Sequence, residues 1–313
     1  MKQTEISIPT SMVKPLSING LNGRVLRRRS IKQKHASREI LAIYGHHSSL
    51  ERMYAIVENL AEYGNVTLPD IPGFGGMDAF YVIHKTPTLD NYADYLATFI
   101  KLKYKKRKFT IVAMSFGFVA VTKMLQKYPE LAKQVDILVS LVGFTTKQDF
   151  KLSIRKQKLI RYTSAFCSNE LSAMFVRYMI LNQYGITLMY NAVAKRHAKM
   201  KDADKAELKR RIKFEIYLWQ CNDVRTYMYT TNTMLNLSIN KVKVEHNVIH
   251  VATEHDQYFK NSSVKKNLSK VYSKVTVIES ALVNHAPTVI SNPSDASGYI
   301  PKKLRRILDR KLK

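Results

Sequence analysis

The sequence contains little that could cross-link the chain or hold it in a membrane. Its 313 residues include two cysteines, Cys167 and Cys221, which could form at most one disulfide and lie in no Cys-x-x-Cys or Cys/His spacing. No stretch approaches the roughly 20 uninterrupted apolar residues that a spanning helix needs. Residues 1–20 lack the apolar segment and cleavage site of a signal peptide. We therefore expect a cytoplasmic protein.

Acidic residues are also scarce. The chain has 24 Asp and Glu against 51 Lys and Arg, a net charge of +27. The excess lies in residues 1–50, 147–232 and 260–313 (+7, +10 and +9), whereas 51–146 and 233–259 are near neutral. Such a surface attracts nucleic acid or anionic membrane, and a generally basic, solvated surface is the alternative. Because no nucleic-acid-binding module is recognisable, we do not expect a nucleic acid partner. Nothing in the pattern indicates an oligomeric state.

Signals for a metal or a bound nucleotide are absent. His46 and His47 are adjacent, but no second cluster with ligand spacing accompanies them, so we expect no zinc site. The glycine-rich segment 72–76, "PGFGG", lacks the spaced glycines and the Lys-Ser/Thr pair of a phosphate-binding loop, and we interpret it as a structural turn. The sequence therefore predicts no cofactor.

The sequence does contain a regular alternation of short apolar segments and amphipathic ones. Strand-like segments occupy 39–45, 65–70, 108–115 and 135–144, and helix-like segments occupy 48–64, 87–106 and 116–130. Short, nearly all-apolar strands separated by helices indicate a parallel sheet that is covered on both faces. We expect an α/β fold of this kind.

The alternation stops after Phe144. Residues 145–220 are helical and basic in pattern, and strand-like segments return at 247–256 and 274–280. We therefore predict a core formed by 1–144 and 221–313, with 145–220 inserted as a helical cap. Within the insertion, five residues form an apolar stripe that we expect to be the core of the cap, with a pocket wall as the alternative. They are Leu171, Met174, Phe175, Tyr178 and Met179.

The basic segment 301–313, "PKKLRRILDRKLK", has its apolar residues on one helical face. These residues are Leu304, Ile307, Leu308 and Leu312. The face could dock onto the body of the protein. The alternative is that it lies on an anionic membrane surface, which would place the protein at the inner face of the membrane.

A serine follows the strand-like segment that ends near residue 114, in the sequence "AMSFGFVAV" (113–121). A small-x-Ser-x-Gly pattern arises by chance on the order of 0.2 times in a chain of this length, and a serine there could simply cap a helix. As a nucleophile, Ser115 would need a general base, an acid to orient the base, and donors for the oxyanion. In a parallel sheet these groups lie beyond the carboxyl ends of the strands.

Four segments resemble the α/β-hydrolase superfamily, most closely its lipase and esterase-type members with a helical cap. They are "LAIYGHHSSLERM" (41–53), "VTLPDIPGFGGMD" (66–78), "YADYLATFIKLKYKKRKFTIVAMSFGFVAV" (92–121) and "KYPELAKQVDILVSLVG" (127–143). Tyr44, Ala113 and Phe118 depart from the family pattern, which usually has histidine at the first position and glycine at the other two.

The resemblance implies a triad in the chain order Ser, acid, His. It places Ser115 as the nucleophile, Asp256 as the acid and His285 as the base, with Glu254 as the competing carboxylate. It also implies two backbone N–H donors for the oxyanion, from Phe116 and from His46.

The resemblance further implies a serine hydrolase that cleaves a carboxylic ester of a small acyl or lipid-like molecule through an acyl-enzyme. The same triad would serve an acyltransferase or a hydrolase of thioester, amide or C–C bonds, or support perhydrolysis. A ligand receptor without turnover, and a scaffold that docks nucleic acid or membrane through its basic surface, are further alternatives.

Overall fold

A computed structural model describes residues 8–193, 204–254, 256–280, 285 and 296–310. Its centre is a sheet with the strand order β1-β2-β4-β3-β5-β6-β7-β8. Neighbouring strands from β4 to β8 are parallel, whereas β2 is antiparallel to both β1 and β4. The strands are β1 (Val13–Ile18), β2 (Leu21–Arg28), β3 (Glu39–Ile43), β4 (Asn65–Pro69), β5 (Phe109–Met114), β6 (Val135–Leu141), β7 (Val244–Thr253) and β8 (Tyr272–Ser280).

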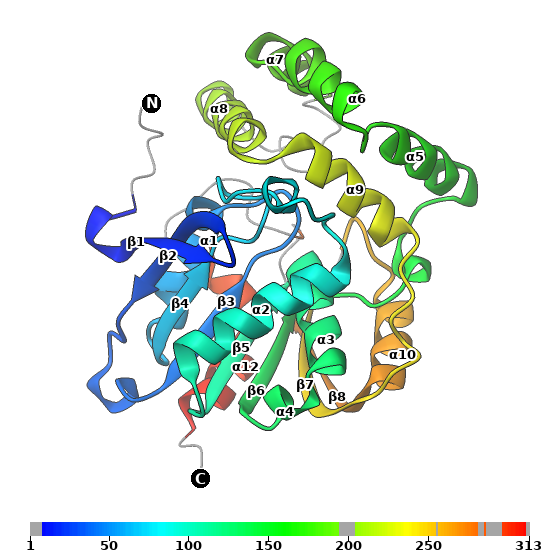
Figure 1. The fold of residues 1–313 in the computed structure, drawn as a ribbon. Coiled ribbons are helices and arrows are strands. Elements are labelled where there is room, and N and C mark those ends of the chain that lie inside the picture. The colour runs from blue at the N-terminus through cyan, green and yellow to red at the C-terminus, as the bar shows by residue number, and fades with distance from the viewer. Residues whose placement is uncertain (1–7, 194–203, 255, 281–284, 286–295, 311–313) are drawn as a thin grey trace.

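Helices cover both faces of this sheet, which confirms the predicted fold class (Figure 1). One face carries α1 (Leu50–Leu60) and α12 (Lys302–Asp309), and the other carries α2 (Leu89–Tyr104), α3 (Ser115–Lys127) and α10 (Asn261–Val271). The short α4 (Pro129–Ala132) follows α3. All six residues of β5 are buried, as expected for a strand with a helical layer on each side.

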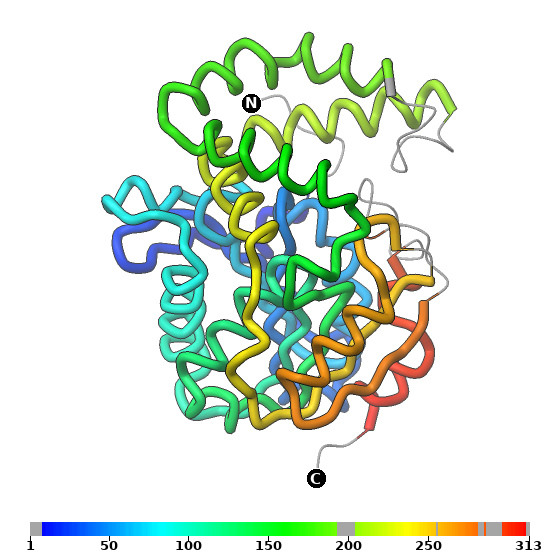
Figure 2. Tube along the Cα trace, turned by 90° about the vertical axis from the view of Figure 1, so that its right-hand side faces the viewer, coloured from blue at the N-terminus to red at the C-terminus, as the bar shows by residue number. Residues whose placement is uncertain are grey.

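A helical segment lies between β6 and β7, two strands that are neighbours in the sheet. Its helices stand above one end of the sheet (Figures 1 and 2). They are α5 (Ile154–Phe166), α6 (Glu170–Phe175), the π-helix η5 (Val176–Ile180), α7 (Gln183–Val193), α8 (Lys205–Cys221) and α9 (Val224–Leu235). The end of the cap at residue 220 stays a prediction. Helix α9 begins after that residue and packs against α5 and α6.

Five single turns of 3-10 helix complete the described secondary structure. They are η1 (Thr10–Met12), η2 (Gln33–His35), η3 (Phe80–Ile83), η4 (Lys147–Asp149) and η6 (Ser297–Tyr299). None of the described helices is both long and apolar enough to cross a bilayer.

The apolar stripe predicted to be the core of the cap is exposed, so that prediction is wrong. Leu171 is 83% exposed, and Met174, Phe175, Tyr178 and Met179 are exposed as well. The small cap core forms on the opposite side of these helices, around buried residues that include Ala173, Ile186, Ile212 and Trp219. The stripe therefore forms neither the core of the cap nor a pocket wall.

The apolar face of α12 is docked on the body of the protein. Leu304 and Leu308 are buried in the main hydrophobic core, and Ile307 packs against it. Leu312 lies outside the described residues. Leu304, Ile307 and Leu308 are therefore docked on the body, and contact of segment 301–313 with a membrane stays a prediction.

Candidate active site

The turn from β5 into α3 places Ser115 in a strained backbone conformation. Its φ is 48°, in the left-handed region that residues with a side chain rarely adopt. Such a conformation costs of the order of 1–3 kcal/mol and persists where the surrounding structure enforces it. The preceding Met114 is the last residue of a fully buried strand, so the turn lies at the carboxyl end of the sheet.

Close packing around this turn requires small residues. A Cβ atom on Gly117 would lie 2.2 Å from the carbonyl oxygen of Tyr44, and a Cβ on Gly45 would lie 3.0 Å from the Cβ of Ser115. The end of β3 and the start of α3 can therefore approach each other only because both positions lack a side chain.

Three side chains that are distant in the sequence meet at this turn. The Nε2 atom of His285 lies 3.0 Å from the Oγ of Ser115, and its Nδ1 lies 2.8 Å from Oδ2 of Asp256. His285 and Asp256 are buried, and Ser115 is partly exposed. The structure thus brings together the three side chains that the sequence analysis named, in the order hydroxyl, imidazole, carboxylate.

The carboxylate of Asp256 is held by several donors. Its Oδ1 accepts the backbone N–H groups of Tyr258 and Phe259, at 2.7 and 3.0 Å. Burial by itself would raise the pKa of Asp256, but the hydrogen bond and charge of His285 and these two N–H groups lower it below its ordinary value. Glu254, the competing carboxylate, is exposed, whereas the two ring nitrogens of His285 contact Asp256 and Ser115.

The two predicted backbone donors are adjacent to Ser115. Phe116 is the second residue of α3, and the first N–H groups of a helix have no acceptor within it. His46 follows Gly45, whose Cβ position lies 3.6 Å from the Phe116 nitrogen. Both residues therefore lie near the serine, and the role of their N–H groups at an oxyanion stays a prediction.

The side chain of His46 is hydrogen-bonded, and it is not placed to act as a general base. Its Nε2 lies 2.9 Å from the Thr230 hydroxyl and 3.2 Å from the carbonyl oxygen of Tyr227. Burial, with a further contribution from the neighbouring His47, lowers the pKa of His46 to about 3. The ring is therefore neutral near pH 7 and contacts Tyr227, with 4.3 Å between the ring centroids.

A cavity of about 410 Å³ opens at Ser115 and His285, between the core and the helical segment. Its size is in the range of sites that bind small molecules. Its walls are mainly apolar and aromatic side chains. These include Phe150, Leu152, Ile160, Tyr190, Trp219, Tyr227, Met234, Leu235, Tyr258 and Phe259.

A buried ion pair that the sequence analysis missed joins α1 to the helical segment beside this cavity. Arg52 donates to Glu215 at 2.5 Å, and both side chains are buried. Glu215 also accepts from the Tyr190 hydroxyl at 3.1 Å and lies 3.4 Å from Nε2 of His47. No local motif marks these residues, because Arg52 and Glu215 are 163 positions apart.

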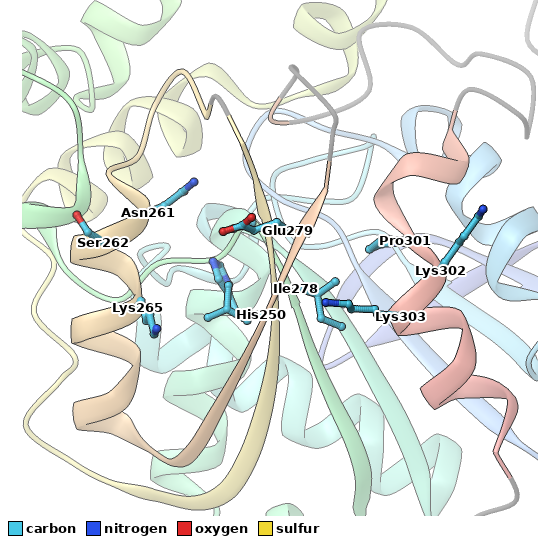
Figure 3. Close-up of a pocket in the computed structure, with 11 residues that line it drawn as sticks. His250, Asn261, Ser262, Lys265, Ile278, Glu279, Pro301, Lys302 and Lys303 are labelled. Atoms are coloured by element: carbon cyan, nitrogen blue, oxygen red, sulfur yellow. The ribbon is translucent and has the colours of Figure 1, made fainter.

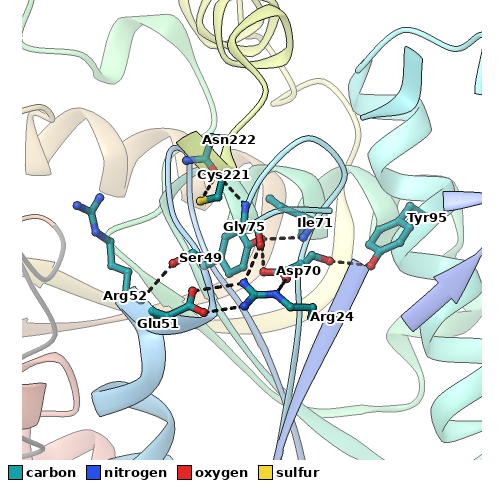
Figure 4. Close-up of polar contacts among 11 residues, drawn as sticks. Arg24, Ser49, Glu51, Arg52, Asp70, Ile71, Gly75, Tyr95, Cys221 and Asn222 are labelled. Atoms are coloured by element: carbon teal, nitrogen blue, oxygen red, sulfur yellow. Dashed lines mark hydrogen bonds and ion pairs between the residues drawn. The ribbon is translucent and has the colours of Figure 1, made fainter. Parts of the chain in front are cut away.

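A second buried network fixes the loop after β4. The Tyr44 hydroxyl donates to Asp70 at 3.0 Å and accepts the N–H of Ile71 at 2.9 Å. Figure 4 shows the Arg24 guanidinium among the side chains of Asp70 and Glu51, 3.0 and 2.7 Å away. Tyr44, one of the departures from the family pattern, therefore ties the end of β3 to this loop.

A larger hollow, of about 620 Å³, lies elsewhere, around β8 between α10 and α12 (Figure 3). It is lined by charged side chains that include Lys265, Glu279, Lys302 and Lys303, and it contains none of the three side chains grouped at the β5 turn. Among the described residues, no group of three or more His, Cys, Asp or Glu could hold a metal ion.

No protein-family profile and no protein of curated function matches this sequence. Solved structures do match it. It is similar to the enol-lactonase from Burkholderia xenovorans LB400, with 12% identity and a TM-score of 0.64 over 95% of this chain and all of that one. It is also similar to an epoxide hydrolase from Bacillus megaterium, with 13% identity and a TM-score of 0.62 over 94% of this chain and 98% of that one. A thermophilic esterase from Thermogutta terrifontis is similar as well, with 13% identity and a TM-score of 0.61 over 95% of this chain and 98% of that one. Likeness at these identities concerns the fold.

Proposed function

We propose that this chain, which has the α/β-hydrolase fold, is a serine hydrolase that cleaves a carboxylic ester through an acyl-enzyme. The observation that carries the proposal is the chain of two contacts from Ser115 through His285 to Asp256, at 3.0 and 2.8 Å. A serine hydroxyl becomes a nucleophile when a base accepts its proton, and a base so placed needs a carboxylate to orient it.

In the first half of the reaction, Oγ of Ser115 attacks the ester carbonyl carbon while Nε2 of His285 takes the hydroxyl proton. The carbonyl electron pair moves onto oxygen, and the new O–C bond gives a tetrahedral oxyanion. When the oxyanion collapses, the C–O bond to the leaving alkoxide breaks and His285 returns the proton to it. An alcohol leaves, and the acyl group stays on the serine.

In the second half, a water molecule attacks the acyl carbon and His285 takes its proton. The intermediate collapses, the serine oxygen leaves and regains that proton, and a carboxylic acid is released. Asp256 keeps Nδ1 of the imidazole protonated and stabilises the imidazolium in both halves. Its lowered pKa keeps it charged in that role.

The backbone N–H groups of Phe116 and His46 would donate to the oxyanion. The positive end of α3 adds to the stabilisation, because Ser115 and Phe116 form its first turn. Donors fixed by the backbone need no reorganisation when charge develops, which is why such sites contribute strongly to rate.

The cavity supports a substrate with an acyl or aromatic group. Its apolar and aromatic walls stabilise an apolar group bound beside the reacting carbonyl. A small-molecule acyl ester in the cytoplasm, as the sequence predicted, is the partner that we propose.

A fluorophosphonate probe tests the nucleophile, because it reacts with activated serines. We expect the wild-type protein to be labelled and Ser115→Ala to stay unlabelled. Absence of labelling in a folded wild-type protein would contradict the proposal. A panel of esters with increasing acyl length then tests turnover. Labelling without hydrolysis of any ester would favour the acyltransferase or ligand-receptor alternatives.

A further inference from the structure

The outermost helices of the molecule expose an unusual number of large apolar side chains. Eighteen such side chains are exposed in the described part of the chain, and thirteen of them lie on α5, α6, η5 and α7. We call these thirteen the outer cap face. They are Ile154, Leu159, Tyr162, Phe166, Leu171, Met174, Phe175, Tyr178, Met179, Ile180, Tyr184, Leu188 and Met189.

The four helical elements turn these side chains away from the body of the protein. On α7, Ile186 and Tyr190 are buried, whereas Tyr184 and Leu188 on the opposite side are 87% and 74% exposed. Inward, α5 and α6 pack on α9, and α7 packs on α8. The inner faces are thus covered by a second helical layer. The exposed side chains lie on the opposite side of the outer helices. Figure 2 shows these outer helices at one end of the molecule.

Basic residues accompany this apolar surface. Arg155, Lys156 and Lys158 are exposed on α5, and the helix contains no acidic residue. Between residues 151 and 193 the sequence has six basic residues and one acidic residue, Glu170, which pairs with Arg225 at 3.2 Å. A group of exposed large apolar side chains on neighbouring helices is typical of an interaction site, and the charge around it calls for an anionic partner.

We infer that the outer cap face docks on the surface of an anionic lipid bilayer. Long apolar side chains reach the acyl boundary, flanking lysines and arginines reach the headgroups, and tyrosines are favoured at the interface between the two. A second copy of the chain fits less well, because it would bring the basic α5 against another basic α5 with no acidic partner in the same segment.

Docking in this way brings the bilayer to helices that also border the catalytic cavity. Ile160 on α5 and Tyr190 on α7 line the cavity, and the outward residues of the same two helices belong to the outer cap face. The surface that contacts lipid is distinct from segment 301–313, whose apolar residues Leu304 and Leu308 are buried.

Flotation of the full chain with phosphatidylglycerol/phosphatidylcholine vesicles tests the inference. We expect the wild-type protein to float with these vesicles at low salt, and to bind pure phosphatidylcholine more weakly. Raising salt from 0.01 to 1 M should weaken binding, because the Debye length falls from about 30 to about 3 Å. A wild-type protein that binds neither kind of vesicle overturns the inference.

The apolar part is tested by the triple variant Phe166→Ser, Phe175→Ser and Leu188→Ser. All three side chains are exposed, so the fold should be retained, and circular dichroism checks this. We expect the partition onto anionic vesicles to fall by at least about tenfold, because apolar area buried at the interface sets the binding strength. Binding equal to that of the wild type overturns the inference.

The matched control replaces three exposed apolar residues outside the cap, as Val82→Ser, Leu102→Ser and Val242→Ser. This variant should float like the wild type, and equal losses in both triple variants would overturn the inference. The basic part is tested by Lys156→Gln and Lys158→Gln, each expected to weaken binding to anionic vesicles about fivefold at low salt.

The alternative that the outer cap face binds a second copy of the chain is tested by light scattering. A wild-type dimer that Phe166→Ser, Phe175→Ser and Leu188→Ser convert to monomer would overturn the inference. These measurements do not depend on catalysis, because Ser115→Ala should bind vesicles like the wild type. Failure of the hydrolase proposal and failure of this inference are therefore separate results.

Discussion

At the scale of single residues, the strained serine and its imidazole are expected to act as one unit. Removing either the hydroxyl of Ser115 or the ring of His285 breaks the same 3.0 Å contact. We predict that Ser115→Ala and His285→Ala each lower kcat by a similar factor of roughly 10⁴–10⁶, measured on any ester found to be a substrate.

The acid can be tested against its competitor. Asp256→Asn should lower kcat by about 10⁴-fold, because the imidazole would lose its orienting acceptor. Glu254→Gln, two residues away and exposed, should leave kcat near that of the wild type. The reverse pattern, or near-full turnover by His285→Ala, would show that the proposed roles are wrong.

Tyr44 is expected to contribute to stability through its hydroxyl group. Tyr44→Phe removes the donor to Asp70 and leaves the N–H of Ile71 without its acceptor in a buried site. We predict a loss of about 1–3 kcal/mol in the free energy of unfolding, measured by urea denaturation. Tyr162→Phe, at an exposed position, is the control and should change it by less than about 0.5 kcal/mol.

At the scale of secondary structure elements, the Arg52–Glu215 pair holds the helical segment against the core. Arg52→Met should lower the free energy of unfolding by about 3–5 kcal/mol, because Glu215 would stay buried without its cation. The double variant Arg52→Met, Glu215→Leu should recover part of this loss. A double variant with the summed loss of both single variants would show that the two residues are not coupled.

The docked face of α12 can be tested in the same way. Leu304→Ala should lower the free energy of unfolding by about 2–5 kcal/mol, because it leaves a cavity in the main core. Leu102→Ala, at a 65% exposed position on α2, should have little effect. Equal unfolding midpoints for the two variants would contradict the docking of α12.

The elements that the sequence predicted best are those that bury apolar residues on both sides. The expected segments 39–45, 65–70 and 108–115 correspond to β3, β4 and β5. A short continuous apolar run is typical of a strand that is buried on both faces. The β1–β2 hairpin was not predicted, although Asn19 and Gly20, both with positive φ, form its turn.

The apolar stripe on α6 and η5 shows why part of the structure could not be predicted. Periodicity identifies a helical face with apolar residues, but it does not show whether another element covers that face. Leu304 on α12 and Leu171 on α6 belong to similar patterns, and the first is buried while the second is exposed. The side chains at Ser115 could be named because the family order of nucleophile, acid and base fixes them in the sequence. No family order of this kind identifies Arg52 and Glu215 in the sequence.

At the scale of the whole molecule, buried histidines should make stability depend on pH. Burial lowers the pKa of His250 to about 4, below the value of about 6.5 in an unfolded chain. Between these pH values the unfolded state binds more protons, so the stabilisation is present above pH 6.5 and is lost as the pH falls toward 4. The loss for this residue is about 3 kcal/mol.

The measurement is the free energy of unfolding as a function of pH. His250→Asn should flatten the curve between pH 6.5 and 4. The buried His46, whose pKa burial lowers to about 3, should keep a residual slope in the His250 variant. A wild-type curve that is flat across this range would contradict the prediction.

The separation of residues 115 and 285 along the chain has a consequence for synthesis of the protein. The imidazole leaves the ribosome 170 residues after the hydroxyl that it contacts, with the whole helical segment between them. A polypeptide that ends before residue 285 therefore contains the residues of β3 to β6 and Ser115 but lacks the imidazole that contacts the serine hydroxyl. On the proposed mechanism, a translation product that ends before residue 285 is therefore expected to show no esterase activity, even though it contains Ser115.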